Sequence, residues 1–277
     1  MSNPDRALRV AAGVDPMGEG RFLAHLSPHY TIGDNHPNGG YLQCVIASAG
    51  LAEAAEQGST HTHVTAQTTN YVGSPSLGMV ELQVDVRKVG RAVTFAHVTM
   101  TQEGRVMTES VLTLGTLSDE PLIRYVDAAP PDVAPLEDIP SPPATGDVSI
   151  RSVIEQRLDP RSVAWVRGEV SDRGEILGWM RLNDGESQWD PWSLLFAADA
   201  LPPATFPLGS HMWTPTLQLT TFVRGVPRGE WLRARQWCVV VADNLVDERC
   251  ELFDETDQLV AVASQLAMVR FPHATTV

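Results

Sequence analysis

The stretch Asn38-Gly39-Gly40 carries the first residues whose types and spacing could do chemistry. It stands directly before a helical pattern, and glycines at such a point let a ligand approach the backbone closely. The first amide N–H groups of a helix have no acceptor within the helix, so the amides here, that of Gly40 included, can stabilise negative charge on a carbonyl oxygen. The structural alternative is that Asn38 serves only as the N-cap.

Four acidic or histidine side chains are candidates for a general base. Asp34 and His36 lie just upstream of the same helix, although a lone histidine is more often structural or merely exposed. Asp190 and Asp199 fall on a second predicted helix. We expect Asp190 to be its N-cap. Asp199 could face a site, but a solvated position is the simpler expectation for it.

Two glutamines interrupt apolar, strand-like runs. Gln265 lies among Ala263, Leu266 and Met268, and Gln218 lies between Leu217 and Leu219. A buried amide needs hydrogen-bond partners, so a polar residue inside a core strand suggests a function.

Basic residues gather at predicted strand ends, where arginine suits phosphate groups. The alternative is ordinary solvation. These residues are Arg87, Lys88, Arg91, Arg224 and Arg228. His61 and His63 would share one face of a strand, but two histidines without a third ligand are weak evidence for a metal. We therefore predict no metal and no cofactor.

These residues are positioned by two runs of elements in the same order. The first run begins with a strand at 21–32, and its helix follows the turn at 33–40, with apolar residues spaced by three and four from Leu42 to Ala52. Gly58-Ser59 stops that helix. The remaining predicted elements are strands at 64–72, 79–89, 92–102 and 105–114, then a second run with a strand at 175–182, a helix at 190–200, and strands at 214–224, 230–241, 248–253 and 258–271.

A proline-rich segment separates the two runs. Residues 119–147 hold seven prolines, at 121, 130, 131, 135, 140, 142 and 143. Prolines this dense do not fit inside a sheet or a helix. We predict a first repeat at 1–118, a connector at 119–147 and a second repeat at 148–277. Residues 65–72 also match 216–223 in type and pattern, which supports an internal repeat.

One long helix packed on an antiparallel sheet, present twice in one chain, is a double hotdog in the α+β class. The second half resembles the acyl-CoA thioesterase II group of double-hotdog proteins, through Glu230-Trp231-Leu232, the turn at 254–257 and the terminal strand at 259–270. Asn38-Gly39-Gly40-Tyr41 resembles the start of that family's first helix, and residues 213–220 resemble the strand that carries its catalytic Asp.

The resemblance implies hydrolysis of fatty acyl-CoA by an Asp, a Thr or Ser, and a Gln that together hold the attacking water. In this chain the Asp position falls on Gln218, the Thr position falls on Val239, and the Gln position is kept as Gln265. Glutamine cannot act as a general base near neutral pH, and valine can neither donate nor accept a hydrogen bond. Gly39, Tyr41, His36, Val239 and Arg224 are expected to contact the substrate.

Two function hypotheses follow. In the first, water attacks the acyl-CoA carbonyl, with Gln265, Gln218, Gly40 and Asn38 as the catalytic groups. In the second, the same groove binds acyl-CoA or an acyl chain without catalysis. A hotdog hydratase or dehydratase is a third option, and it would need a His–Asp pair that the sequence does not indicate.

Composition limits the partners and the location. The net charge of −14 disfavours nucleic acid, whose binding depends on neutralising phosphates with Lys and Arg. No run approaches 18 apolar residues, so we expect no membrane span. The three cysteines include no CxxC pair, and we expect them to be reduced in the cytoplasm. A homodimer or higher homo-oligomer is the expected assembly.

Overall fold

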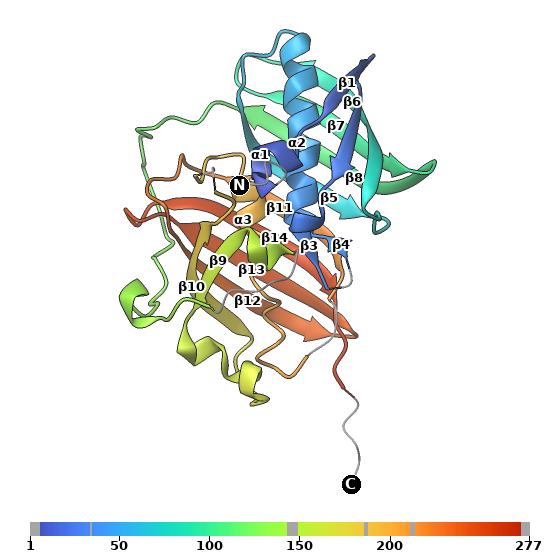
Figure 1. Ribbon diagram of the computed structural model, residues 1–277. Helices are drawn as coiled ribbons and strands as arrows, with labels where there is room; N and C mark the ends of the chain where they lie inside the picture. Colours follow the sequence, from blue (N-terminus) through green and yellow to red (C-terminus); the bar gives the residue numbers. More distant parts are fainter. Residues whose placement is uncertain (1–5, 34, 143–148, 186–187, 211–213, 273–277) are drawn as a thin grey trace.

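A single curved antiparallel sheet organises the chain in the computed structural model, which describes residues 6–33, 35–142, 149–185, 188–210 and 214–272 (Figure 1). Within the described residues this sheet has 12 strands in the order β1-β2-β6-β7-β8-β5-β11-β14-β13-β12-β10-β9. In the N-terminal part these are Asp15–Gly18 (β1), Arg21–Leu26 (β2), His63–Tyr71 (β5), Gly78–Val89 (β6), Thr94–Gln102 (β7) and Arg105–Gly115 (β8). In the C-terminal part they are Ile154–Leu158 (β9), Glu175–Leu182 (β10), Thr216–Val223 (β11), Leu232–Ala242 (β12), Leu245–Phe253 (β13) and Leu259–Met268 (β14).

The strand order repeats about the middle of the sheet. On one side the order is β2-β6-β7-β8-β5, and on the other it is β10-β12-β13-β14-β11. The two strands whose sequences resemble each other, β5 and β11, are the antiparallel central pair, with Thr68 opposite Thr220 and their hydroxyls 3.0 Å apart. The sheet therefore runs unbroken from one half of the chain to the other.

Helix α2 (Gly39–Glu56) is the one long helix of the described residues, and it lies across the strands of the N-terminal half (Figure 1). Asn38 caps it, because its Oδ1 accepts a hydrogen bond from the amide of Tyr41 at 2.9 Å. Its side chains are buried nearly all round, with sheet strands on one side and α3 on another. This explains why its apolar pattern is broader than that of a surface helix.

The prediction of a second long helix at residues 190–200 is wrong. Only Leu194–Ala197 (α3) is α-helical there. The Asp190 side chain accepts from the amide of Ser193 at 2.7 Å, and the Ser193 hydroxyl donates back to the Asp190 carbonyl at 3.0 Å. Such local bonds offer the backbone an alternative to helical pairing. Asp190 thus caps a turn before α3, and Pro202-Pro203 prevents any extension beyond it.

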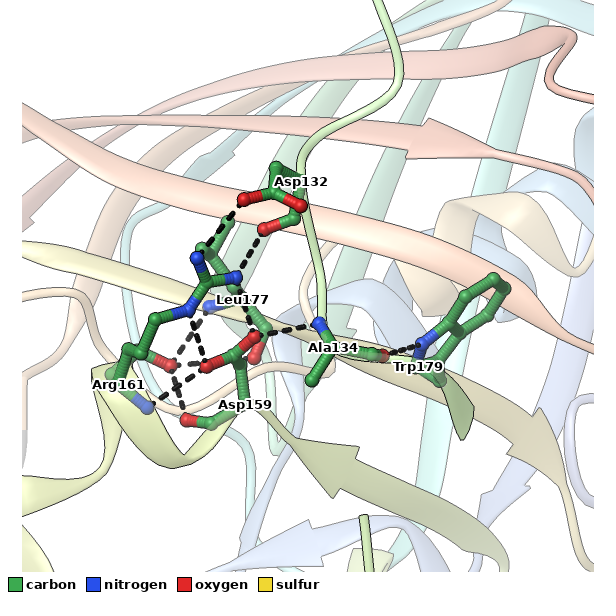
Figure 2. Close-up of polar contacts among 7 residues, drawn as sticks. Asp132, Ala134, Asp159, Arg161, Leu177 and Trp179 are labelled. Atoms are coloured by element: carbon green, nitrogen blue, oxygen red, sulfur yellow. Dashed lines mark hydrogen bonds and ion pairs between the residues drawn. The ribbon is translucent and has the colours of Figure 1, made fainter. Parts of the chain in front are cut away.

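The described part of the connector, up to residue 142, contains one 3₁₀ turn, Leu136–Asp138 (η3), and no strand. Figure 2 shows how it is fixed to the C-terminal half. The fully buried Asp159 carboxylate accepts from the amide of Ala134 at 2.8 Å, and the Trp179 ring N–H donates to the Ala134 carbonyl at 3.0 Å. Arg161 bridges Asp159 and Asp132. The boundaries 1–118, 119–147 and 148–277 stay a prediction.

Burial alone would raise the pKa of the Asp159 carboxyl. Hydrogen bonds from the Arg161 guanidinium, and from the Ala134 and Arg161 amides, outweigh burial and lower that pKa below its ordinary value. Asp159 is therefore ionised at neutral pH, and it holds the connector against β10. No helix in the described part of the chain is long and apolar enough to span a bilayer.

Candidate active site

A cavity of about 1050 Å³ opens where the short α3 leaves room beside the C-terminal half of the sheet. Its wall includes the first residues of α2, the segment 199–206 after α3, and the connector at Ile139 and Pro140. Most of the lining side chains are apolar, among them Ile150, Ile154, Leu158, Val163, Trp165 and Phe206. An apolar cavity with a few converging polar groups is the usual form of a small-molecule site.

Asp199 is the acidic group closest to the start of α2. Its Oδ2 accepts hydrogen bonds from the Gly40 amide at 2.9 Å and from the Asn38 side-chain Nδ2 at 3.1 Å. The Asn38 Nδ2 also donates to the Asp199 carbonyl at 2.8 Å. These hydrogen bonds hold Asp199 in place. Because Asp199 also lines the cavity, its carboxylate reaches the space where a ligand would lie.

The environment of Asp199 brings its pKa near neutrality. Burial raises the pKa from 3.8 to about 6, and the hydrogen bonds from Gly40, Asn38 and Gly39 limit the rise. The expectation that Asp199 is a solvated helix carboxylate is wrong. An ionised carboxylate with a pKa just below the working pH can accept a proton from water, as a general base must.

The two glycines of Asn38-Gly39-Gly40 are explained by packing. A Cβ on Gly40 would lie 2.7 Å from the Leu195 carbonyl oxygen and 3.0 Å from the Asp199 Cβ. A Cβ on Gly39 would lie 2.8 Å from the Asp199 Oδ2 and 3.0 Å from the Tyr71 hydroxyl, which donates to the Gly39 carbonyl at 2.8 Å. Glycine at both positions lets α2 approach α3 and the carboxylate closely.

The same geometry changes the role of the first helical amides. They were expected to be available for a carbonyl oxygen of the substrate. Instead the Gly40 amide is taken by Asp199, and the Tyr41 amide is taken by the Asn38 side chain. The start of α2 therefore holds the carboxylate of Asp199 rather than a vacant set of donors.

Gln265 lies in the cavity wall on β14. Its side-chain amide makes no hydrogen bond with any other residue that the structure describes, so its donors and acceptor are open to a ligand. Directly opposite on β13 lies Glu248, which also lines the cavity and is 2% exposed. Gln236 on β12 completes this polar part of the wall.

His36 lines the cavity, and its Nδ1 lies 3.2 Å from the Ser74 hydroxyl. Tyr41 does not line it. The Tyr41 ring is fully buried, its hydroxyl donates to the Ala11 carbonyl at 2.6 Å, and it stacks on Tyr30. The role of Tyr41 is therefore structural. Asp34 lies outside the described residues.

Three other predicted residues lie away from the cavity. Gln218 is exposed, and its side chain donates to the Asn70 side chain at 3.1 Å. Val239 is 55% exposed beside an irregularity in β12. Arg224 is exposed just after β11, whose opposite end, at Thr216 and Leu217, lines the cavity. The structure thus brings together Asn38, Gly39, His36, Asp199 and Gln265 but not these three.

Sequence reasoning missed Glu248 and Gln236. A signal was available in the alternation of β13, where Val246, Glu248, Cys250 and Leu252 share one face and the other three are apolar. An acidic residue on the apolar face of a strand is unusual without a partner or a function.

Comparisons with known proteins agree with this fold. Residues 26–115 match the model of the acyl-CoA thioesterase N-terminal domain, and residues 125–269 match that of the acyl-CoA thioesterase C-terminal domain. The chain belongs to this acyl-CoA thioesterase family.

Three known proteins are similar to this chain in sequence or in fold. A proposed thioesterase II from Thermobifida fusca YX is 32% identical, with a TM-score of 0.87 over 98% of this chain and 100% of that one. A hot-dog-fold protein of unknown function from Alicyclobacillus acidocaldarius is 19% identical, with a TM-score of 0.83 over 96% and 98% of the two chains, and shows the fold alone. An uncharacterized protein of Mycobacterium tuberculosis is 26% identical, with 90% of each chain covered.

Proposed function

We propose that this chain hydrolyses acyl-CoA thioesters to a free acid and CoA by direct attack of water, with Asp199 as the general base. The observation that carries the proposal is the Asp199 carboxylate, fixed by Gly40 and Asn38 at the wall of a mostly apolar cavity. The family to which the chain belongs supports thioester hydrolysis as the reaction.

The reaction assigns a task to each group. Asp199 takes a proton from water while the water oxygen bonds to the thioester carbonyl carbon, the carbon–sulfur bond then breaks, and the proton passes from Asp199 to the leaving thiolate to release CoA. The Gln265 amide holds the same water, and the apolar wall at Leu158, Trp165 and Phe206 receives the acyl chain. None of the three cysteines lines the cavity, so we propose no thiol nucleophile and no covalent intermediate.

The departures at Gln218 and Val239 do not weaken this proposal. They suggested a degraded catalyst when they were aligned with catalytic positions, but neither side chain reaches the cavity. A carboxylate from the segment after α3 supplies the base instead.

The first experiment measures thiol release from a panel of acyl-CoAs, short to long, with a heat-killed control. We expect saturable release by the wild type and a loss of about 10²–10⁴-fold in kcat for Asp199→Asn, the usual contribution of a general base. Asp247→Asn is the matched control, because Asp247 is exposed on β13 and does not line the cavity.

Two results would decide against hydrolysis at this site. If the wild type releases no thiol while acyl-CoA still raises its melting temperature, the chain is a binding protein. If Asp199→Asn keeps activity within a few-fold of the wild type, Asp199 is not the base.

A further inference from the structure

Glu248 is a buried acid that the proposed reaction does not use. It lies on β13 with 2% of its surface exposed. Its Oε1 accepts a hydrogen bond from the Ala204 amide at 2.9 Å, and its Oε2 accepts one from the Gln236 side chain at 2.8 Å. Gln236 also donates to the Pro202 carbonyl at 3.3 Å. These hydrogen bonds anchor the segment that follows Asp199, and the anchored residue Ala204 lies five positions after Asp199 in the sequence.

An anchoring role does not require an acid. A glutamine could accept the hydrogen bond from Ala204 through its oxygen and donate to the oxygen of a rotated Gln236 amide, without placing a titratable group in this wall. Among the described residues no Lys, Arg or His forms an ion pair with Glu248. A buried carboxyl without a cation favours its neutral form, because burial penalises the charge.

The charge of Asp199, from the segment after α3, strengthens this preference. Burial and the charge of Glu248 raise the pKa of the Cys238 thiol on β12 and of the Cys250 thiol on β13, so neither thiol offers Glu248 a compensating charge. Burial is the main cause that raises the pKa of Glu248, to about 7, with a further contribution from the negative charge of Asp199, while the Ala204, Gln236 and Thr205 hydrogen bonds lower it. The neutral acid carries an O–H that can donate.

A donor is needed at this point of the cavity. Negative charge develops on the thioester carbonyl oxygen as water attacks, and a fixed donor must stabilise it. The amides of Gly40 and Tyr41 are already taken. Glu248 lies directly opposite Gln265, with Cβ atoms about 5 Å apart in such a pair, so it is one strand away from the group that holds the water.

We infer that Glu248, in its neutral form, is a second catalytic residue that donates a hydrogen bond to the thioester carbonyl oxygen. The inference rests on the proposed hydrolysis. Asp199 must be ionised to accept a proton, and Glu248 must be protonated to donate. Activity therefore rises as pH increases through about 6 and falls as pH increases through about 7, with the two carboxyls titrating as a coupled pair.

The test is the pH profile of kcat/KM, followed by loss of the thioester absorbance, for the wild type, Glu248→Gln and Glu248→Met. The amide of Gln donates at every pH, so Glu248→Gln should keep at least about a tenth of the maximal activity and lose the alkaline fall. Met donates nothing, so Glu248→Met should lose about 10²–10³-fold in kcat. Glu251→Gln on the same strand is the matched control, because Glu251 does not line the cavity, and its profile should equal that of the wild type.

Three results would overturn the role of Glu248. They are a wild-type profile with no alkaline fall, a Glu248→Gln profile that keeps the fall, and a folded Glu248→Met protein with wild-type kcat. The wild-type profile needs no variant, so the inference can be tested even if the Glu248→Met protein does not fold. Each of these leaves hydrolysis standing, whereas a wild type that hydrolyses no acyl-CoA removes both proposals.

Discussion

Asp199 shows what a functional carboxylate costs at the scale of one residue. Burial among apolar groups raises its pKa to about 6, so the ionised form is held at a cost in stability near neutral pH. The hydrogen bonds from Gly40 and Asn38 recover only part of that cost. Sites that need such a group commonly sacrifice stability to keep it.

Replacing Asp199 with Asn should therefore stabilise the fold while it lowers kcat. The folded pKa exceeds the unfolded value of 3.8, so the native state binds more protons between these values and its stability falls as pH rises from about 4 to about 6. At pH 7 the Asn variant should gain up to about 3 kcal/mol in the free energy of unfolding, and near pH 4 the difference should vanish. Denaturant unfolding at both pH values measures this, and a variant less stable at pH 7 would contradict it.

At the scale of elements, the contact between α2 and α3 places the base. Helix α2 begins with two glycines because the backbone of α3 and the Asp199 side chain lie where their Cβ atoms would be. The shortness of α3 has a second effect, since the sheet face that a longer helix would cover is left to the cavity.

Gly40→Ala tests this contact. The new Cβ would meet the carbonyl oxygens of Leu195 and Phe196 at 2.7 and 2.9 Å, which are backbone atoms that cannot move cheaply. We expect a loss of about 1–3 kcal/mol in stability and at least a tenfold fall in kcat as Asp199 is displaced. Gly50→Ala is the control on the same helix, because its Cβ would meet the end of the Leu112 side chain at 2.8 Å and the Val98 side chain at 3.7 Å, with no atom of Asp199 or α3 nearby, so kcat should change little. Equal effects of the two variants on kcat would contradict the expectation.

At the scale of the whole molecule, a buried polar network joins the two halves. The Gln43 side chain, on α2, donates to the Leu219 carbonyl at 3.1 Å and accepts from the Thr221 hydroxyl at 2.9 Å, both on β11. It also donates to the Thr69 hydroxyl of β5 at 3.3 Å. All these groups lie beside the central strand pair, so the N-terminal helix is bonded to the C-terminal half.

Gln43→Leu should destabilise the whole chain by about 2–4 kcal/mol, because it removes the acceptor of the buried Thr221 hydroxyl and two further buried hydrogen bonds, to Leu219 and Thr69. Fluorescence of the tryptophans and far-ultraviolet circular dichroism should still report one shared unfolding transition, as expected if the halves unfold together. Gln57→Leu, at the exposed end of the same helix, should change the midpoint little. Two separated transitions in the wild type would show that the halves are independent. The expected homodimer or higher oligomer stays a prediction.

The sequence by itself indicated most strands in their order along the chain, the internal repeat and the long first helix, because these follow from local periodicity, glycine turns and proline content. It also indicated Gln265, since an amide within an apolar strand is a visible exception. It could not place Gln218 or Val239, because a bulge or a short shift in register moves a side chain to the other face of a sheet.

The position of the proposed base and the existence of the cavity follow only from the tertiary structure. Asp199 is 159 positions from Gly40 and becomes its partner because α3 ends early and packs on α2. Glu248 joins the same wall through the pairing of β13 with β14. The pKa of each carboxyl depends on burial and on neighbours from distant segments, and no local pattern contains that information.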